Sequence, residues 1–247
     1  MTVQLIRTSI SVMVMLYLIG LGLDDREITE KGREALGTAD RAFAEFYTNT
    51  ASIDIERLEE ETGTEIERLS REEVEQQEKI SAALEDGDVA FLVSGDPLTA
   101  TTHYDIKHRA EEKGEKVEVI HAPSILTSVA ETGLNVYKFG RVVTLPESSR
   151  PSSVTDHIAD NDSIGLHTLV LLDIDYRADE AAEKLVDMGV DPGREAVVIE
   201  RANHSSQWIN VGRLEDMADA DLGRTPHSIV LVGEMDHKEQ EFLEGHR

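Results

Sequence analysis

The sequence predicts an α/β protein of two domains with a cleft between them, and three observations lead to this prediction. Apolar runs rich in aliphatic and β-branched residues alternate with helical patterns along the chain. Alternating strands and helices are typical of sheets covered on both faces. The 247 residues, 40% hydrophobic and 30% charged, have the composition of a globular protein that is long enough for two domains.

The first half of the chain contains four predicted strands and four predicted helices. The strands are expected at residues 15–20, 41–47, 88–93 and 116–121. The helices are expected at residues 29–37, 53–61, 70–84 and 101–112. Thr29 is a suitable N-cap for the first helix, and Ser70 and Glu73 have the spacing of a capping box. Gly63 closes the second helix.

The second half continues the alternation without a detectable internal repeat. Its strands are expected at residues 167–174, 195–200, 207–211 and 227–232, and its helices at residues 124–131 and 178–188. The Pro- and Ser-rich residues 146–153 indicate a loop. The change of domain falls most naturally near residues 121–124. We therefore predict a first domain at residues 15–122 and a second at residues 123–247.

The beginning of the chain imitates a signal peptide. Residues 10–23 are apolar and follow Arg7, but they are fewer than a membrane span needs. The acidic residues Asp24 and Asp25 follow, where a cleavage site would have small residues. We interpret the second half of this stretch as the first buried strand, and residues 1–14 as an upstream extension. The expected location is cytoplasmic, with no membrane attachment.

Acidic residues greatly outnumber basic ones. The chain has 50 Asp and Glu against 24 Lys and Arg, which gives a formal charge of −26. A field of this sign repels phosphate backbones and argues against independent nucleic-acid binding. The acidic residues are spread along the whole chain, which is typical of a solvated surface rather than of an interaction tail. This distribution suggests adaptation to high salt.

Two glycine-containing loops follow predicted strands, the positions at which open α/β sheets bind ligands. Gly20 and Gly22 match the start of a dinucleotide fingerprint, but Asp25 stands in place of its third glycine. Ser94-Gly-Asp-Pro97 forms the second loop, and its Asp96 is able to accept hydrogen bonds from a ligand hydroxyl or ammonium group. Taken singly, each loop is more often an ordinary turn than a binding site.

Taken together with further motifs, these loops resemble the tetrapyrrole methylase superfamily of S-adenosylmethionine-dependent enzymes. Within it the chain is similar to the archaeal diphthine synthases, from residue 15 to near the C-terminus. The motifs are FAEFYT at residues 43–48, GDPLTATTH at 95–103, HAPSI at 121–125, VYKFG at 136–140 and LHTLVLLD at 166–173. Each motif is weak by itself, whereas the ordered set is specific.

The resemblance implies a homodimer that holds S-adenosyl-L-methionine in the cleft between the two domains of each subunit. The methyl group would pass to the amino group of a modified histidine in translation elongation factor 2. The cofactor contacts implied by the matching motifs are Leu23, Asp96, Thr99, Ser124, Ile125, Leu172, Ala202 and His227. Asn203 follows Ala202 at a position where relatives often have glycine.

Methyl transfer from a sulfonium needs a positioned nucleophile and a water-free site rather than a metal or a nucleophilic triad. The chain has no cysteine, and His121, His167 and His204 lack the spacing of metal ligands. His103 and His227 are the candidates for a general base, since free imidazole titrates near pH ~6.5. A capping or helix-face role is commoner for His103, and ligand packing for His227, so we assign no catalytic base.

Three alternatives stay open at this point. The first is a methylase of the same superfamily that acts on a corrin or another tetrapyrrole ring, although the diphthine-type motifs disfavour it. The second is a non-catalytic cofactor-binding module. The third is a nicotinamide dehydrogenase, against which Asp25 argues.

Overall fold

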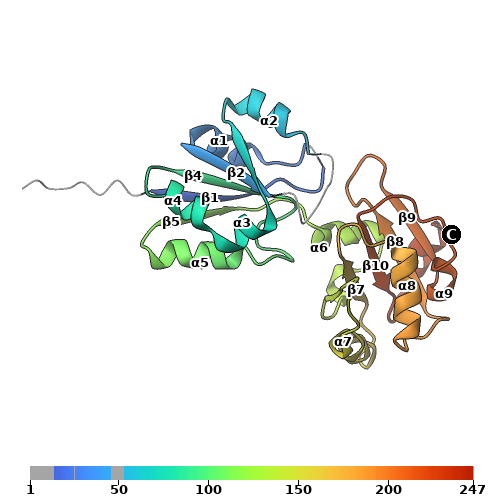
Figure 1. Ribbon diagram of the computed structural model, residues 1–247. Helices are drawn as coiled ribbons and strands as arrows, with labels where there is room; N and C mark the ends of the chain where they lie inside the picture. The colour runs from blue at the N-terminus through green and yellow to red at the C-terminus, as the bar shows by residue number, and fades with distance from the viewer. Residues whose placement is uncertain (1–13, 25, 46–52, 247) are drawn as a thin grey trace, which may run out of the picture.

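The computed structural model describes residues 14–24, 26–45 and 53–246, and the predictions made for residues 1–13 and 46–52 lie outside it. Two five-stranded sheets lie side by side, with the short helix α6 (Ile125–Ser128) between them (Figure 1). The last strand of the first sheet ends at Ile120, and the first strand of the second sheet begins at Val143. The expected α/β fold with two sheets is confirmed. The predicted domain boundary falls in the connection between the sheets.

The first sheet is entirely parallel, with the strand order β3-β2-β4-β1-β5. Its strands are β1 (Met15–Gly20), β2 (Arg41–Glu45), β3 (Ile66–Leu69), β4 (Val89–Val93) and β5 (Lys116–Ile120). The central β4 is buried at every position, as expected for a strand covered on both faces. The edge strand β3 was not predicted, because it is four residues long and half of it is charged.

Helices cover both faces of this sheet. On one face lie α1 (Glu30–Thr38) and α2 (Ile55–Thr62), and on the other lie α3 (Arg71–Gln76), α4 (Glu78–Ala83) and α5 (Tyr104–Glu112). The predicted caps at Thr29 and Ser70 are present. The prediction of one helix over residues 70–84 is wrong. Gln77 adopts a left-handed conformation with φ +58° and separates α3 from α4.

The second sheet is mixed, with the strand order β6-β7-β10-β8-β9. Its strands are β6 (Val143–Leu145), β7 (Thr168–Leu172), β8 (Glu195–Glu200), β9 (Trp208–Arg213) and β10 (His227–Leu231). β10 runs antiparallel to both β7 and β8, so its first residue lies at the same edge as their last residues. The short β6 was not predicted.

The helices of the second half also lie on both faces of their sheet. One face is covered by α7 (Ser152–Asp162), α8 (Ala178–Asp187) and α9 (Leu214–Met217). The other face is covered by the 3₁₀-helix η1 (Val129–Thr132) and by α10 (His237–Glu244). The helix predicted at residues 124–131 is α6 followed by η1, while α7 and α10 were missed. A second 3₁₀ turn, η2 (Val136–Lys138), precedes β6.

A buried carboxylate anchors the last helix. Glu239 is 2% exposed and accepts hydrogen bonds from Lys138, from His167 and from two main-chain amides. The amide of Gly233 donates to Nδ1 of His167, which places the ring proton on Nε2, facing Glu239. Burial raises the pKa of Glu239, but the hydrogen bonds outweigh this effect and lower the pKa to about 2. Burial lowers the pKa of His167.

We predict that Glu239→Gln lowers the free energy of unfolding at neutral pH by about 3 kcal/mol, because the substitution breaks a buried, charge-assisted network. The exposed Glu244→Gln on the same helix is the control, with an expected effect within about 0.5 kcal/mol. Urea titrations of both variants and the wild type measure these differences.

The same variants have an expected pH dependence. The pKa of folded Glu239 lies below the unfolded value of 4.5. Its contribution is therefore complete above pH 4.5 and is lost as the pH falls towards 2. The stability difference between wild type and Glu239→Gln should narrow over this window. A difference that stays constant down to pH 2 would contradict the assigned ionisation.

Candidate functional site

One pocket of about 360 Å³ lies where the carboxyl ends of both sheets meet. The loops after β1, β4 and β5 form one side of it, and the ends of β7 and β8 form the other. β10 contributes its first residues, because it runs antiparallel to its neighbours. A pocket of this volume at the carboxyl edge of α/β sheets is typical of a small-molecule site.

All eight residues that the sequence motifs implied as cofactor contacts line this single pocket: Leu23, Asp96, Thr99, Ser124, Ile125, Leu172, Ala202 and His227. They come from both halves of the chain and from the connection between them. Several further residues line the pocket and were not among the implied cofactor contacts: Arg71, Glu75, Ser94, Thr144, Asp173, Arg201 and His204. Ser94 belongs to the predicted ligand loop. Arg71 and Glu75 lie on a helix that carries none of the family motifs, so only the fold reveals that they face the pocket.

The glycines of the two loops act through close backbone packing. The amide of Gly22 donates to the carbonyl of Gly95 at 3.1 Å, and the amide of Gly95 donates back to Gly22 at 2.7 Å. A Cβ atom at Gly20 would lie 2.7 Å from the carbonyl oxygen of Gly95 and 2.8 Å from the Cβ of Ala122. Gly20 and Gly22 therefore join β1 to the Asp96 loop.

The carboxylate of Asp96 is held in one orientation at the pocket wall. Its Oδ1 accepts hydrogen bonds from the amide of Leu98 at 3.0 Å and from the hydroxyl of Thr99 at 3.1 Å. Its Oδ2 lies 2.6 Å from Nδ1 of His121, whose side chain is 67% exposed. Asp96 itself is 7% exposed. His121, the first residue of the HAPSI motif, is therefore the partner of Asp96.

One buried polar atom in the pocket wall, Oγ of Ser94, makes no hydrogen bond of normal geometry with the described residues. Nδ1 of His227 accepts a hydrogen bond from the amide of Ala178 at 3.0 Å, so Nε2 carries the ring proton and bonds the main chain of Leu222. Burial lowers the pKa of His227, which keeps the ring neutral. The hydroxyl of Ser94 thus has unused hydrogen-bonding capacity, which fits a polar ligand.

His103 contacts β4 and the Asp96 loop but does not itself line the pocket. The ring is 1% exposed, packs edge-on against Phe91 at 5.2 Å between centroids, and hydrogen-bonds the main chain of Pro97. Burial lowers the pKa of His103 to about 4. It occupies the N-cap position of α5 without a side-chain capping bond. These contacts stabilise the Asp96 loop and give His103 a structural role.

The turn after β8 has an unusual backbone. Arg201 and Asn203 both have positive φ, at +49° and +63° respectively. Glycine adopts such conformations without strain, and asparagine is among the residues that tolerate them best. Asn203 therefore keeps the backbone shape that glycine would provide there, and Ala202 between the two residues faces the pocket.

Within the described ranges, no three His, Asp or Glu side chains gather in a way that would hold a metal ion. No helix in the same part of the chain is long and apolar enough to cross a bilayer.

Comparisons with known proteins agree with this geometry. Residues 15–218 match the tetrapyrrole (corrin/porphyrin) methylase family. The chain is 43% identical to a diphthine synthase of Halorubrum lacusprofundi, over 94% of this chain and 96% of the relative. It is 38% identical to the diphthine methyl ester synthase of Schizosaccharomyces pombe, over 93% of each chain.

A solved structure gives the same result. A crystal structure of a diphthine synthase superposes with a TM-score of 0.88 at 34% identity, and the match covers 94% of this chain and 95% of the other. Likeness of this extent covers both sheets and the pocket between them. The chain therefore belongs to the tetrapyrrole methylase family and, within it, to the diphthine synthases.

Proposed function

We propose that the protein transfers methyl groups from S-adenosyl-L-methionine to the amino group of the modified histidine in translation elongation factor 2. The observation that carries this proposal is that eight residues named from separate sequence motifs line one pocket. The names of the relatives supply the reaction class and the protein substrate. We place the reaction in the cytoplasm.

The pocket residues divide into polar and apolar groups. The carboxylate of Asp96 and the hydroxyl of Ser94 would bind the polar groups of the cofactor, while Leu23, Leu172 and the ring of His227 would pack against its other parts. When bound, S-adenosylmethionine supplies an electrophilic methyl group on a sulfonium. The protein then has to align the acceptor amine with the methyl group and exclude water.

The acceptor atom has one specific alternative. The relative in Schizosaccharomyces pombe is named a diphthine methyl ester synthase, which means that its product carries a methylated carboxyl group. Transfer to a carboxylate oxygen is therefore the second candidate for this chain. The two products differ chemically, because mild base hydrolyses an ester and leaves an N-methyl group intact.

The Asp96 carboxylate should contribute to the affinity for the cofactor. Asp96→Asn keeps an oxygen for the amide of Leu98 but loses the negative charge, so S-adenosylhomocysteine should bind about tenfold or more weakly. Calorimetric titration measures the affinity, with NADH as a ligand that should not bind. The exposed Asp216→Asn on α9 is the control and should bind as the wild type does. Equal affinities in all three proteins would contradict the proposed site.

The methylated product identifies the acceptor atom. Incubation with S-adenosylmethionine and elongation factor 2 that carries the unmethylated modified histidine should add methyl groups to that residue, as mass spectrometry of the digested factor would show. The added mass should survive mild base treatment. Loss of the mass in base would favour the ester alternative. Methylation of a tetrapyrrole ring without methylation of the factor would overturn the proposal.

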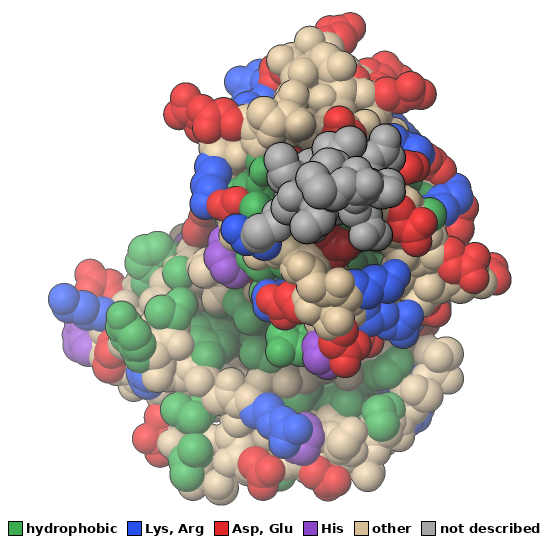
Figure 2. Space-filling view, turned by 90° about the vertical axis from the view of Figure 1, so that its left-hand side faces the viewer, with side chains coloured by type: hydrophobic (Ala, Val, Ile, Leu, Met, Phe, Trp, Pro, Cys, Tyr) green, Lys and Arg blue, Asp and Glu red, His purple; other side chains and the backbone are tan. Residues whose placement is uncertain are grey.

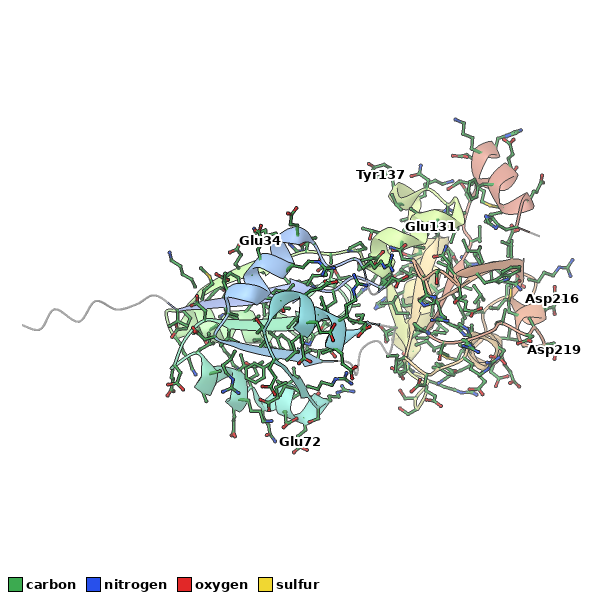
Figure 3. The ribbon with its side chains drawn as sticks, turned by 90° about the horizontal axis from the view of Figure 1, so that it is seen from above. Glu34, Glu72, Glu131, Tyr137, Asp216 and Asp219 are labelled. Carbon is green, nitrogen blue, oxygen red and sulfur yellow. The ribbon has the colours of Figure 1, made fainter. Side chains whose placement is uncertain are left out.

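The surface suggests the conditions in which the protein works. Acidic side chains are scattered over the upper part and the edges of the face shown in Figure 2, and Glu34, Glu72, Asp216 and Asp219 point outward in Figure 3. Relatives come from the halophiles Halorubrum lacusprofundi and Halobacterium salinarum. We propose adaptation to high salt, since salt screens repulsion between like charges. The titrations above should therefore show binding in molar KCl, and binding only at millimolar KCl would contradict this.

We also propose that the protein is a homodimer. Tyr137 is 91% exposed and points away from the body of the molecule in Figure 3, and the neighbouring Val136 is 42% exposed. The family resemblance implies a homodimer, and these exposed apolar side chains would contribute to its interface. Light scattering should give twice the chain mass of 27.4 kDa, and a monomer at assay concentration would contradict the proposal.

A further inference from the structure

Two turns from opposite halves of the molecule meet beside the pocket. The turn after β1 carries Leu23 and Glu27, and the turn after β8 carries Ala202 and Asn203. Nδ2 of Asn203 donates a hydrogen bond of 2.8 Å to Oε1 of Glu27, across a sequence separation of 176 residues. Because Leu23 and Ala202 both line the pocket, this bond joins its two walls.

Glu27 is fixed on its own side of this contact. Its Oε2 accepts hydrogen bonds from the amides of Leu23 at 2.6 Å and Asp24 at 3.2 Å, so the carboxylate holds the backbone that forms the pocket wall. The side chain folds back over Gly22, which has φ +78°. A Cβ atom at Gly22 would lie 2.2 Å from the Cβ of Glu27, so a larger residue would expel the carboxylate from this position.

Asn203 is fixed on the opposite side. Its main-chain amide donates to Oε1 of Gln207 at 2.6 Å, and its φ of +63° turns the side chain towards Glu27. Glycine would adopt this φ with less strain but has no side-chain amide. What asparagine adds at this position is therefore the donor that reaches the other half of the molecule.

We propose that Glu27 and Asn203 form an interdomain clasp that keeps the pocket closed and slows the release of the bound cofactor. Both are positioning residues, and the inference rests on the proposed function of the pocket. A bond between two walls has to break whenever the walls separate, so it acts on the rate of opening. The donor is a neutral amide, so the clasp contains no ion pair that molar salt would screen.

The test is the dissociation rate of S-adenosylhomocysteine, measured by stopped-flow displacement. Asn203→Gly keeps the backbone conformation and the amide that donates to Gln207, and it removes only the side-chain donor. We expect dissociation to be about tenfold faster, the effect of one hydrogen bond to a charged group. Asn203→Asp places a second carboxylate against Glu27 and should accelerate dissociation at least as much.

A double-mutant cycle separates the clasp from a general loosening of either turn. Glu27→Gln should also accelerate dissociation, and the double variant Glu27→Gln/Asn203→Gly should be no faster than the faster single variant. Strictly additive effects would overturn the proposal, as would an unchanged rate in both Asn203 variants. Melting of the ligand-free variants verifies folding, and Asn203→Asp provides the comparison if Asn203→Gly is unstable.

The dissociation experiment distinguishes an error in the clasp proposal from an error in the proposed function. Wild-type protein that binds no S-adenosylhomocysteine would overturn both. Wild-type protein that binds it normally, with clasp variants that release it at the same rate, would overturn the clasp alone.

Discussion

The pocket depends on the close approach of three backbone segments at the carboxyl end of β1. A Cβ atom at Gly20 would collide with the carbonyl of Gly95 and with Ala122. Two residues further along the chain, the main chains of Gly22 and Gly95 exchange two hydrogen bonds. This packing sets the Asp96 loop and the connection to the second half against the end of the first strand. A side chain at Gly20 would therefore widen the pocket at its base.

Burial alone does not distinguish structural from functional polar groups in this molecule. Both ring nitrogens of His167 are bonded inside the protein, and its partner Glu239 accepts several hydrogen bonds. His227 is buried to a similar extent and is also bonded to the protein, at the amide of Ala178 and the main chain of Leu222, yet it lines the pocket. The first pair stabilises the last helix, whereas His227 forms part of the pocket wall.

The elements that could be predicted from the sequence are those with a strong local signal. The buried β1, β4, β7 and β10 have continuous apolar runs, and the caps at Thr29 and Ser70 have their usual spacing. The missed α7 is rich in Ser, Thr, Asp and Asn, which are poor helix formers, and only Val154, Ile158 and Asn161 of it are buried. The break at Gln77 depends on packing of two short helices, which no local pattern reports.

The sequence by itself determined the apolar runs, the glycine loops and the motifs, and the resemblance carried by these motifs implied the family and the eight residues that line the pocket. Only the tertiary structure decided the reversed direction of β10, the contact between Asp96 and His121, and the bond between Glu27 and Asn203. The reason is physical. Local patterns depend on neighbouring residues, whereas a hydrogen bond between distant residues forms only when two backbones have been brought together by packing elsewhere.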